Sequence, residues 1–180
     1  MMILLFALTI GYKVMTSHAD VDEQFNSRNI TLTNTTDKIK IDKKIDILID
    51  EDNTYVIDNI VSGNLSLRFK PYTQFGRPNF GYTDATYWVR AELKNESDLT
   101  EWLLEIDSAK LNDVTLYSRD AYGDVHQKQI GNFYPFSDRE VKHKNLVYKL
   151  DVEKGETKTY YLSIRTGGSM QIPISIWNPD

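Results

Sequence analysis

The 180-residue chain contains no cysteine, which excludes disulfides, thiolate metal ligands and a cysteine nucleophile. After residue 20 it also lacks any apolar run approaching the ~18 residues that a membrane helix needs. No stretch keeps a helical period, and no internal repeat is visible. The formal net charge of −5 argues against nucleic acid as the main partner, because phosphate binding favours a basic surface.

Catalytic motifs are missing as well. The chain has no Gly-x-Ser-x-Gly elbow, no phosphate-binding loop and no His-Glu-x-x-His. A carboxylate pair for glycoside hydrolysis could come from Glu92, Glu101, Glu105 and Asp107, but surface acids of an acidic sandwich explain these residues more simply. His126 and His143 have no metal-ligand spacing. We therefore expect no enzyme activity, no metal and no cofactor.

The N-terminus has the pattern of a secretory signal. Residues 3–12 form an apolar segment that is too short to span a bilayer, and Ser17 and Ala19 place small residues at the two cleavage positions. This pattern predicts a signal peptide over residues 1–19, with the mature chain beginning at Asp20 and exported to the periplasm or cell surface. The alternative is a buried strand or helix at the start of the domain.

The next part of the chain divides into a leader and a first strand, over residues 20–44. Residues 20–36 are polar and rich in Asn, Thr and Asp, which predicts a loose leader. The isoleucines from Ile39 to Ile49 share one parity, which predicts a single strand over residues 38–50. We expect the folded domain proper to cover residues 45–178.

The strongest strand pattern lies at residues 87–95. Tyr87, Val89, Ala91 and Leu93 fall on one face, whereas Trp88 and Arg90 fall on the other. Similar short alternating segments follow at intervals of about 8 to 12 residues, separated by turns. This spacing predicts an all-β sandwich or barrel, and the long connections favour a jelly roll.

Trp88 and Arg90 are the first candidate binding residues. An aromatic face can stack on a sugar ring, and a guanidinium can bind hydroxyls or a carboxylate. Alternatively, Trp88 packs under a loop as part of a second layer, and Arg90 pairs with an acid across the strand.

A second set of candidates lies in the long loop after residue 130. Arg139 and His143 can receive an anionic or polyhydroxylated ligand, or they can hold the loop by hydrogen bonds to its carbonyls. Among the aromatic residues before them, we expect Tyr134 to be partly exposed and to belong to the binding surface. Phe133 and Phe136 are expected in the core.

Taken in order, several short segments resemble a known family. No single segment is specific, but the series is. It comprises Tyr87-Trp88-Val89-Arg90, Asn95, Trp102-Leu103-Leu104-Glu105-Ile106, Leu111, Val114, Leu116-Tyr117, Gly131, Pro135-Phe136-Ser137-Asp138-Arg139, His143, Asn145 to Tyr148, Gly155, Tyr160-Tyr161-Leu162, Gly168-Ser169, Ile172-Pro173 and Trp177. Together they resemble the type 2 extracellular sensor domain of bacterial seven-transmembrane receptors with diverse intracellular signalling modules.

The resemblance implies a jelly-roll fold related to carbohydrate-binding modules and a position outside the cytoplasmic membrane. It implies a sensor that detects a small polar ligand or carbohydrate and passes its occupancy to the membrane helices of the parent receptor. The alternative function is a structural or protein-partner-binding ectodomain without a small ligand. In this family an intracellular output module follows the membrane helices, and that module is not expected within these 180 residues.

Overall fold

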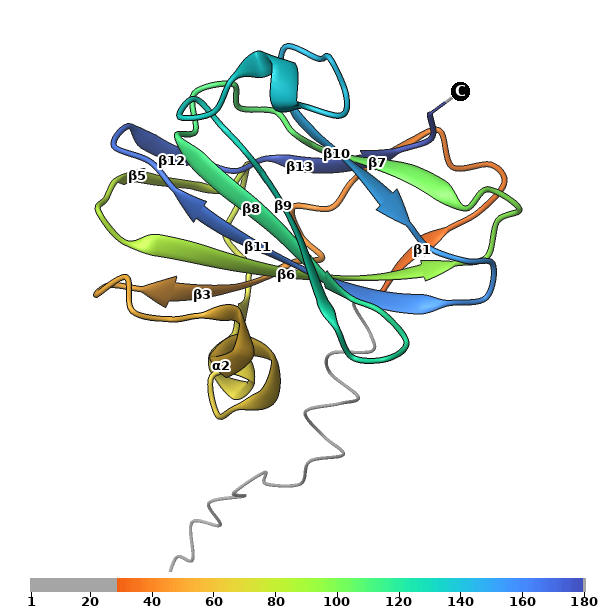
Figure 1. Ribbon diagram of the computed structural model, residues 1–180, viewed down its shortest axis with the longest axis horizontal. Coiled ribbons are helices and arrows are strands. Elements are labelled where there is room, and N and C mark those ends of the chain that lie inside the picture. The colour runs from red at the N-terminus through yellow and green to blue at the C-terminus, as the bar shows by residue number, and fades with distance from the viewer. Residues whose placement is uncertain (1–28, 180) are drawn as a thin grey trace, which may run out of the picture.

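The computed structural model describes residues 29–179, which form two facing β-sheets and a small two-stranded one (Figure 1). The larger sheet runs β4 (Lys70–Pro71), β3 (Asp46–Asp50), β6 (Thr86–Asn95), β11 (Thr157–Arg165), β8 (Asp113–Arg119) and β9 (Val125–Ile130), with β1 (Ile30–Leu32) also paired to β6. The smaller sheet runs β10 (Leu146–Asp151), β7 (Glu101–Ile106), β13 (Ile174–Trp177) and β2 (Lys38–Lys40). The third joins β12 (Ser169–Gln171) to β5 (Asn79–Tyr82). The predicted all-β sandwich is confirmed, and a jelly-roll path remains a prediction.

The ten-residue strand β6 is the central element of the larger sheet. Along one edge it pairs with β11, and along the other it pairs first with β3 and then, in parallel, with β1. Its predicted faces are correct. Tyr87, Val89, Ala91 and Leu93 point into the main core, while Trp88 lies on the opposite face.

The main core fills the space between the two sheets. From the smaller sheet, Trp102, Leu104 and Ile106 alternate inward along β7, and each is 1% exposed or less. Since side chains alternate across a strand, Leu103 and Glu105 point to the outer face of that sheet. This alternation creates the surface on which the candidate site lies.

A helical layer covers the outer face of the larger sheet. It consists of the helix α2 (Ile57–Ser62) and the 3-10 helix η1 (Ser66–Arg68), and Figure 1 shows α2 on the side away from the smaller sheet. A second apolar cluster of Leu48, Ile60, Phe69 and Trp88 is buried there. The segment shows no sequence period because α2 has only six residues, which is less than two turns.

Two predictions for the N-terminal part are wrong. Ile30–Leu32 is not a loose leader but strand β1, with Ile30 and Leu32 fully buried. Residues 38–50 are two strands rather than one, since β2 and β3 belong to different sheets. The connection between them is fixed by the buried Asp42, whose carboxylate accepts a 2.7 Å hydrogen bond from the Ile174 amide.

The long loop over residues 131–145 folds back across one end of the sandwich. It begins at Gly131, whose φ of 149° lies in a region that favours glycine, and it contains the 3-10 helix η2 (Phe136–Asp138). Phe133 and Phe136 are 70% and 53% exposed, so the prediction that they belong to the core is wrong. The loop is held by backbone hydrogen bonds to Leu111 and Asn112 and by its own polar side chains.

The predicted signal peptide of residues 1–19 lies outside the described residues. Over residues 29–179, no helix has the length and apolarity required to cross a membrane.

Candidate functional site

A cleft of about 460 Å³ lies on the outer face of the smaller sheet. Other clefts of comparable volume exist, but this one gathers convergent polar groups beside an aromatic side chain and includes a residue of the predicted binding loop. Such a combination is typical of small-molecule sites. Its lining residues come from β2, β7, β13 and the long loop: Asp37, Lys38, Lys40, Glu105, Asp107, His143, Lys144, Asn145, Ser175 and Trp177.

Glu105 is at the centre of the polar network. Its side chain is nearly buried, and its two oxygens accept hydrogen bonds from different partners. Lys38 donates to Oε2 at 2.5 Å, and the Asn145 amide donates to Oε1 at 2.7 Å. The same amide reaches Asp107 Oδ1 at 2.9 Å. Asn145 therefore connects two carboxylates that neighbour each other along β7 and the turn after it.

The network keeps Glu105 ionised. Burial by itself raises the pKa of this carboxyl, but the hydrogen bonds from Lys38 and Asn145 and the positive charge of Lys38 outweigh burial and lower the pKa. The cleft therefore has a fixed, ordered anion with known partners rather than a proton donor.

His143 and Trp177 form the aromatic part of the cleft. Their ring centroids are 6.3 Å apart, and Lys38 Nζ lies 5.7 Å from the Trp177 ring centroid. His143 Nδ1 accepts a 3.1 Å hydrogen bond from the backbone N–H of Asn145. An accepting Nδ1 is unprotonated, so the neutral imidazole carries its proton on Nε2 and can donate it to a ligand oxygen.

Arg139 holds the loop instead of lining the cleft. The side chain is 8% exposed, stacks over Phe136 at 5.0 Å and donates through Nη1 to the carbonyl oxygens of His143 and Asn145 at 3.1 and 3.4 Å. Of the two roles considered for Arg139, this geometry corresponds to the structural one. It positions the backbone of the two residues that reach Glu105 and Trp177.

The remaining predicted residues lie elsewhere. Tyr134 donates a 3.2 Å hydrogen bond to Asp113 and is not among the cleft residues. Trp88 and Arg90 are on the outer face of the larger sheet, on the opposite side of the sandwich core.

Trp88 and Arg90 have the contacts of a second layer. Trp88 is 2% exposed and stacks on Tyr117 with a centroid distance of 5.7 Å. Arg90 donates to Asp46 at 2.8 Å and to the Ser66 carbonyl at 3.1 Å, and it lies over Phe69. These contacts correspond to the alternative considered from the sequence, in which Trp88 packs under a covering segment and Arg90 pairs with an acid across the strand. Ligand binding by these two residues, as by Arg139 and Tyr134, remains a prediction.

Several cleft residues are not among the ligand-binding residues predicted from the sequence. Trp177 follows the inward isoleucines Ile174 and Ile176, so its parity already placed it on the outer face. Glu105 alternates with Leu104 and Ile106 in the same way. What could not be found from the pattern is that β7 and β13 are neighbours, which brings these outward residues together.

Metal ligation has no support in this arrangement. Within the described part of the chain, no three His, Asp or Glu side chains are grouped as a metal site would require.

A family model matches most of the described chain. The model of the family described as 7TMR-DISM extracellular 2 matches residues 42–178. No curated protein matches the chain. The matched segment includes Glu105, His143 and Trp177, whereas Lys38 and Lys40 of β2 precede it.

Proposed function

This chain belongs to the family of 7TMR-DISM extracellular 2 domains, and from that premise we propose that it senses a small polar ligand, in the first place a carbohydrate, in the cleft on the outer face of the smaller sheet. The family supplies the role of an extracellular sensor domain of a membrane receptor. The cleft supplies the chemistry.

The single observation that carries this proposal is the position of Trp177 next to the Glu105–Asn145 network. A sugar ring has apolar faces of C–H groups and an edge of hydroxyls. An indole ring receives the face, and a carboxylate with an amide receives the edge. His143 Nε2 adds a donor beside Trp177.

The polar groups of the cleft are preorganised for such a ligand. Hydrogen bonds from Lys38 and from the Asn145 side chain fix Glu105 before any ligand arrives. The backbone N–H of Asn145 fixes the His143 ring in the same way. Ordering these rotamers in advance lowers the entropic cost of binding.

Binding without turnover is part of the proposal. A glycosidase needs a carboxylic acid with a raised pKa to protonate the leaving group. The pKa of Glu105 is lowered instead, and both of its oxygens are occupied by donors. Hydrolysis of chromogenic glycosides by the purified domain would overturn this part.

The binding proposal is tested by thermal unfolding against a panel of oligosaccharides, amino acids and nucleotides. A true ligand at 100 times its dissociation constant adds about 2.7 kcal/mol to the free energy of unfolding. Trp177→Ala should abolish the shift, and Trp177→Phe should retain part of it. Tyr122→Ala, at a position that is 93% exposed and outside the cleft, is the matched control.

A protein-binding ectodomain without a small ligand is the second candidate. The observation that favours it is a set of exposed apolar side chains, of which Phe75 is 103% and Tyr82 is 85% exposed. Isolated apolar residues on a surface are common, so this observation is weaker than the cleft. A panel in which no compound shifts the unfolding temperature, together with retained partner binding, would favour this second candidate.

We further propose that the chain is exported through a signal peptide over residues 1–19 and works next to the cytoplasmic membrane, tethered by the membrane helices of a parent receptor. An extracellular domain family fits an exported protein. Expression in a bacterium and intact-mass analysis of the exported protein test the cleavage site. A mature chain beginning at Asp20 is expected, and an exported chain that retains residues 1–19 would contradict it.

A further inference from the structure

The charges of the cleft are not equally available to a ligand. Glu105 is neutralised by Lys38 and hydrogen-bonded by Asn145. Asp107 accepts from Asn145 and pairs with Arg77 at 3.3 Å. Glu105 and Asp107, two carboxylates that line the cleft, thus already have donors.

Two lysines of the cleft have no such partner. Lys40 and Lys144 are exposed, and among residues 29–179 neither ammonium lies within 4.0 Å of a carboxylate or donates a side-chain hydrogen bond. Asp37 at the rim is the lining carboxylate without an ion pair in the described structure. Two unpaired positive charges therefore face one unpaired negative charge.

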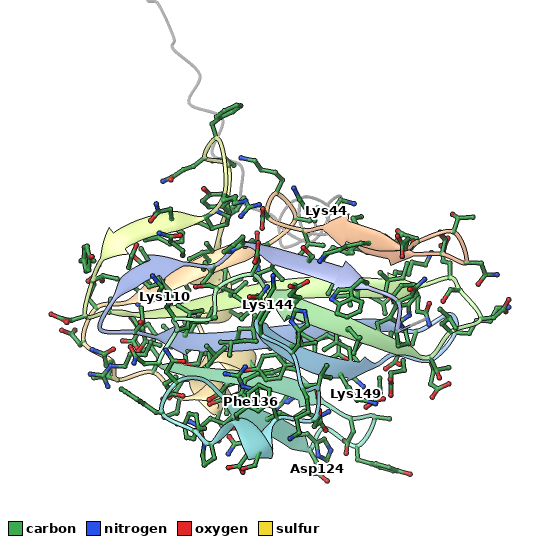
Figure 2. All side chains as sticks on the ribbon, turned by 90° about the horizontal axis from the view of Figure 1, so that it is seen from above. Lys44, Lys110, Asp124, Phe136, Lys144 and Lys149 are labelled. Atoms are coloured by element: carbon green, nitrogen blue, oxygen red, sulfur yellow. The ribbon has the colours of Figure 1, made fainter. Side chains whose placement is uncertain are left out.

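The two lysines approach the cleft from different sides. Lys40 is on β2 and is paired in register with Ser175, whereas Lys144 belongs to the long loop and directly precedes Asn145. Figure 2, which shows the molecule from above, places Lys144 near the middle of that view, apart from Lys110 and Lys149. Ser175 is paired in register with Glu105, so an anionic group above these two residues would lie between β2, which carries Lys40, and the end of the loop that carries Lys144.

We infer that the cleft selects acidic saccharides, with a uronate carboxylate between Lys40 and Lys144 and the sugar ring against Trp177. This inference rests on the proposed function and specifies the class of ligand for the same site. Lys38 does not serve as a third anion-binding group, because it is already paired with the nearly buried Glu105. The two ammonium groups attract a uronate carboxylate, and a neutral sugar has no such group.

The test compares pairs of ligands that differ only in charge. The trimeric oligosaccharides of galacturonate, mannuronate and glucuronate are titrated by calorimetry against the whole domain, each beside its fully methyl-esterified form. At least one acid is expected to bind about tenfold more tightly than its ester. Raising the salt concentration should lower the affinity for the acid and leave the affinity for the ester unchanged, since salt screens interactions between charges.

Variants connect the preference to the two lysines. The double variant Lys40→Gln with Lys144→Gln should reduce acid affinity to the level of the ester and change ester affinity by less than twofold. Lys110→Gln, an exposed lysine outside the cleft, is the matched control and should change neither affinity. Retention of the acid preference in the double variant would overturn the inference.

Failure of the inference and failure of the proposed function give different results. If neutral sugars bind and lose binding in Trp177→Ala, but no acid binds more tightly than its ester, the site stands and the selectivity for acids is wrong. If no saccharide of either kind binds, both are wrong.

Discussion

At the residue scale, the polar side chains of the cleft illustrate how a buried charge is retained. Glu105 is 5% exposed, which is costly for an ionised carboxylate without partners. Lys38 and Asn145 donate to separate oxygens and satisfy it. A glutamine at this position cannot replace the carboxylate, because its Nε2 would face one of these two donors.

Glu105→Gln is therefore expected to lower the free energy of unfolding at pH 7 by about 1.5–3 kcal/mol, the usual range for a hydrogen bond to a charged group. The folded-state pKa of Glu105 is lowered, so its stabilising contribution is fully present above the unfolded value of about 4.3. The contribution is lost as the pH falls through the folded-state pKa. Urea unfolding of both proteins at pH 7, 5 and 3 should show the gap shrinking on acidification.

Glu101→Gln serves as the control for that experiment, because Glu101 is on the same strand but is a half-exposed partner of Lys149. Such surface pairs contribute about 0–1 kcal/mol. A gap for Glu105→Gln that is the same at all three pH values would refute the assignment of an ionised, network-bound Glu105.

The residue scale also shows where sequence reasoning stops. The sequence predicts His143 as a binding residue because a histidine in a long loop can donate to a ligand. In the structure His143 lines the cleft. The sequence does not predict that Trp177 and Glu105 share a binding cleft, although the parity of each residue indicates the outer face. A single strand pattern does not indicate which strand lies next to it. Phe133 and Phe136 were assigned to the core on hydrophobicity alone, and the loop exposes both.

At the element scale, the covering layer of α2 and η1 explains the outward aromatic residue of the strongest strand. An outward Trp88 is expected either to bind a ligand or to be buried by a further layer, and in the structure it is buried in the second apolar cluster. The prediction of one strand over residues 38–50 failed for a related reason. The isoleucines of β2 and β3 keep the same parity through the intervening turn, so the pattern does not reveal the change of sheet.

Packing of the cover is tested by Ile60→Ala. Ile60 belongs to α2 and is fully buried in the second apolar cluster, so the substitution should lower the free energy of unfolding by about 2–5 kcal/mol, as cavities in a core do. Val56→Ala, next to the same helix at a position that is 56% exposed, should cost less than about 0.5 kcal/mol. Chemical denaturation measures both, and equal effects would mean that the helix does not pack as described.

The long loop depends on its first residue. A Cβ at position 131 would overlap the Asn112 carbonyl oxygen, and the φ of 149° disfavours any side chain. Backbone strain alone costs about 1–3 kcal/mol, so Gly131→Ala should lower the free energy of unfolding by more than this amount. It should also weaken ligand binding, because it displaces the loop that carries His143. Gly123→Ala, at a φ of 90° with open space around it, isolates the strain term. Thermal unfolding that is equal for both variants would contradict the close approach.

At the scale of the whole molecule, the three tryptophans report on three different layers. Trp88 is in the outer cluster, Trp102 is in the main core and Trp177 is at the cleft. The larger sheet joins the first two layers, because Leu48 and Trp88 alternate with the core residues Ile47 and Val89 along the same strands. Losing either layer would expose one face of β3 and β6.

This shared sheet predicts cooperative unfolding. In a variant with Trp102→Phe and Trp177→Phe, fluorescence follows Trp88 alone, and its urea midpoint should coincide with the midpoint from far-UV circular dichroism of the same variant. The variant with Trp88→Phe and Trp177→Phe should show the same agreement for Trp102. A Trp88 transition that precedes the loss of strand signal would mean that α2 and η1 unfold separately. Coincident midpoints would mean that the helical cover and the sandwich form one folding unit, so that the layer over Arg90 unfolds only together with the core.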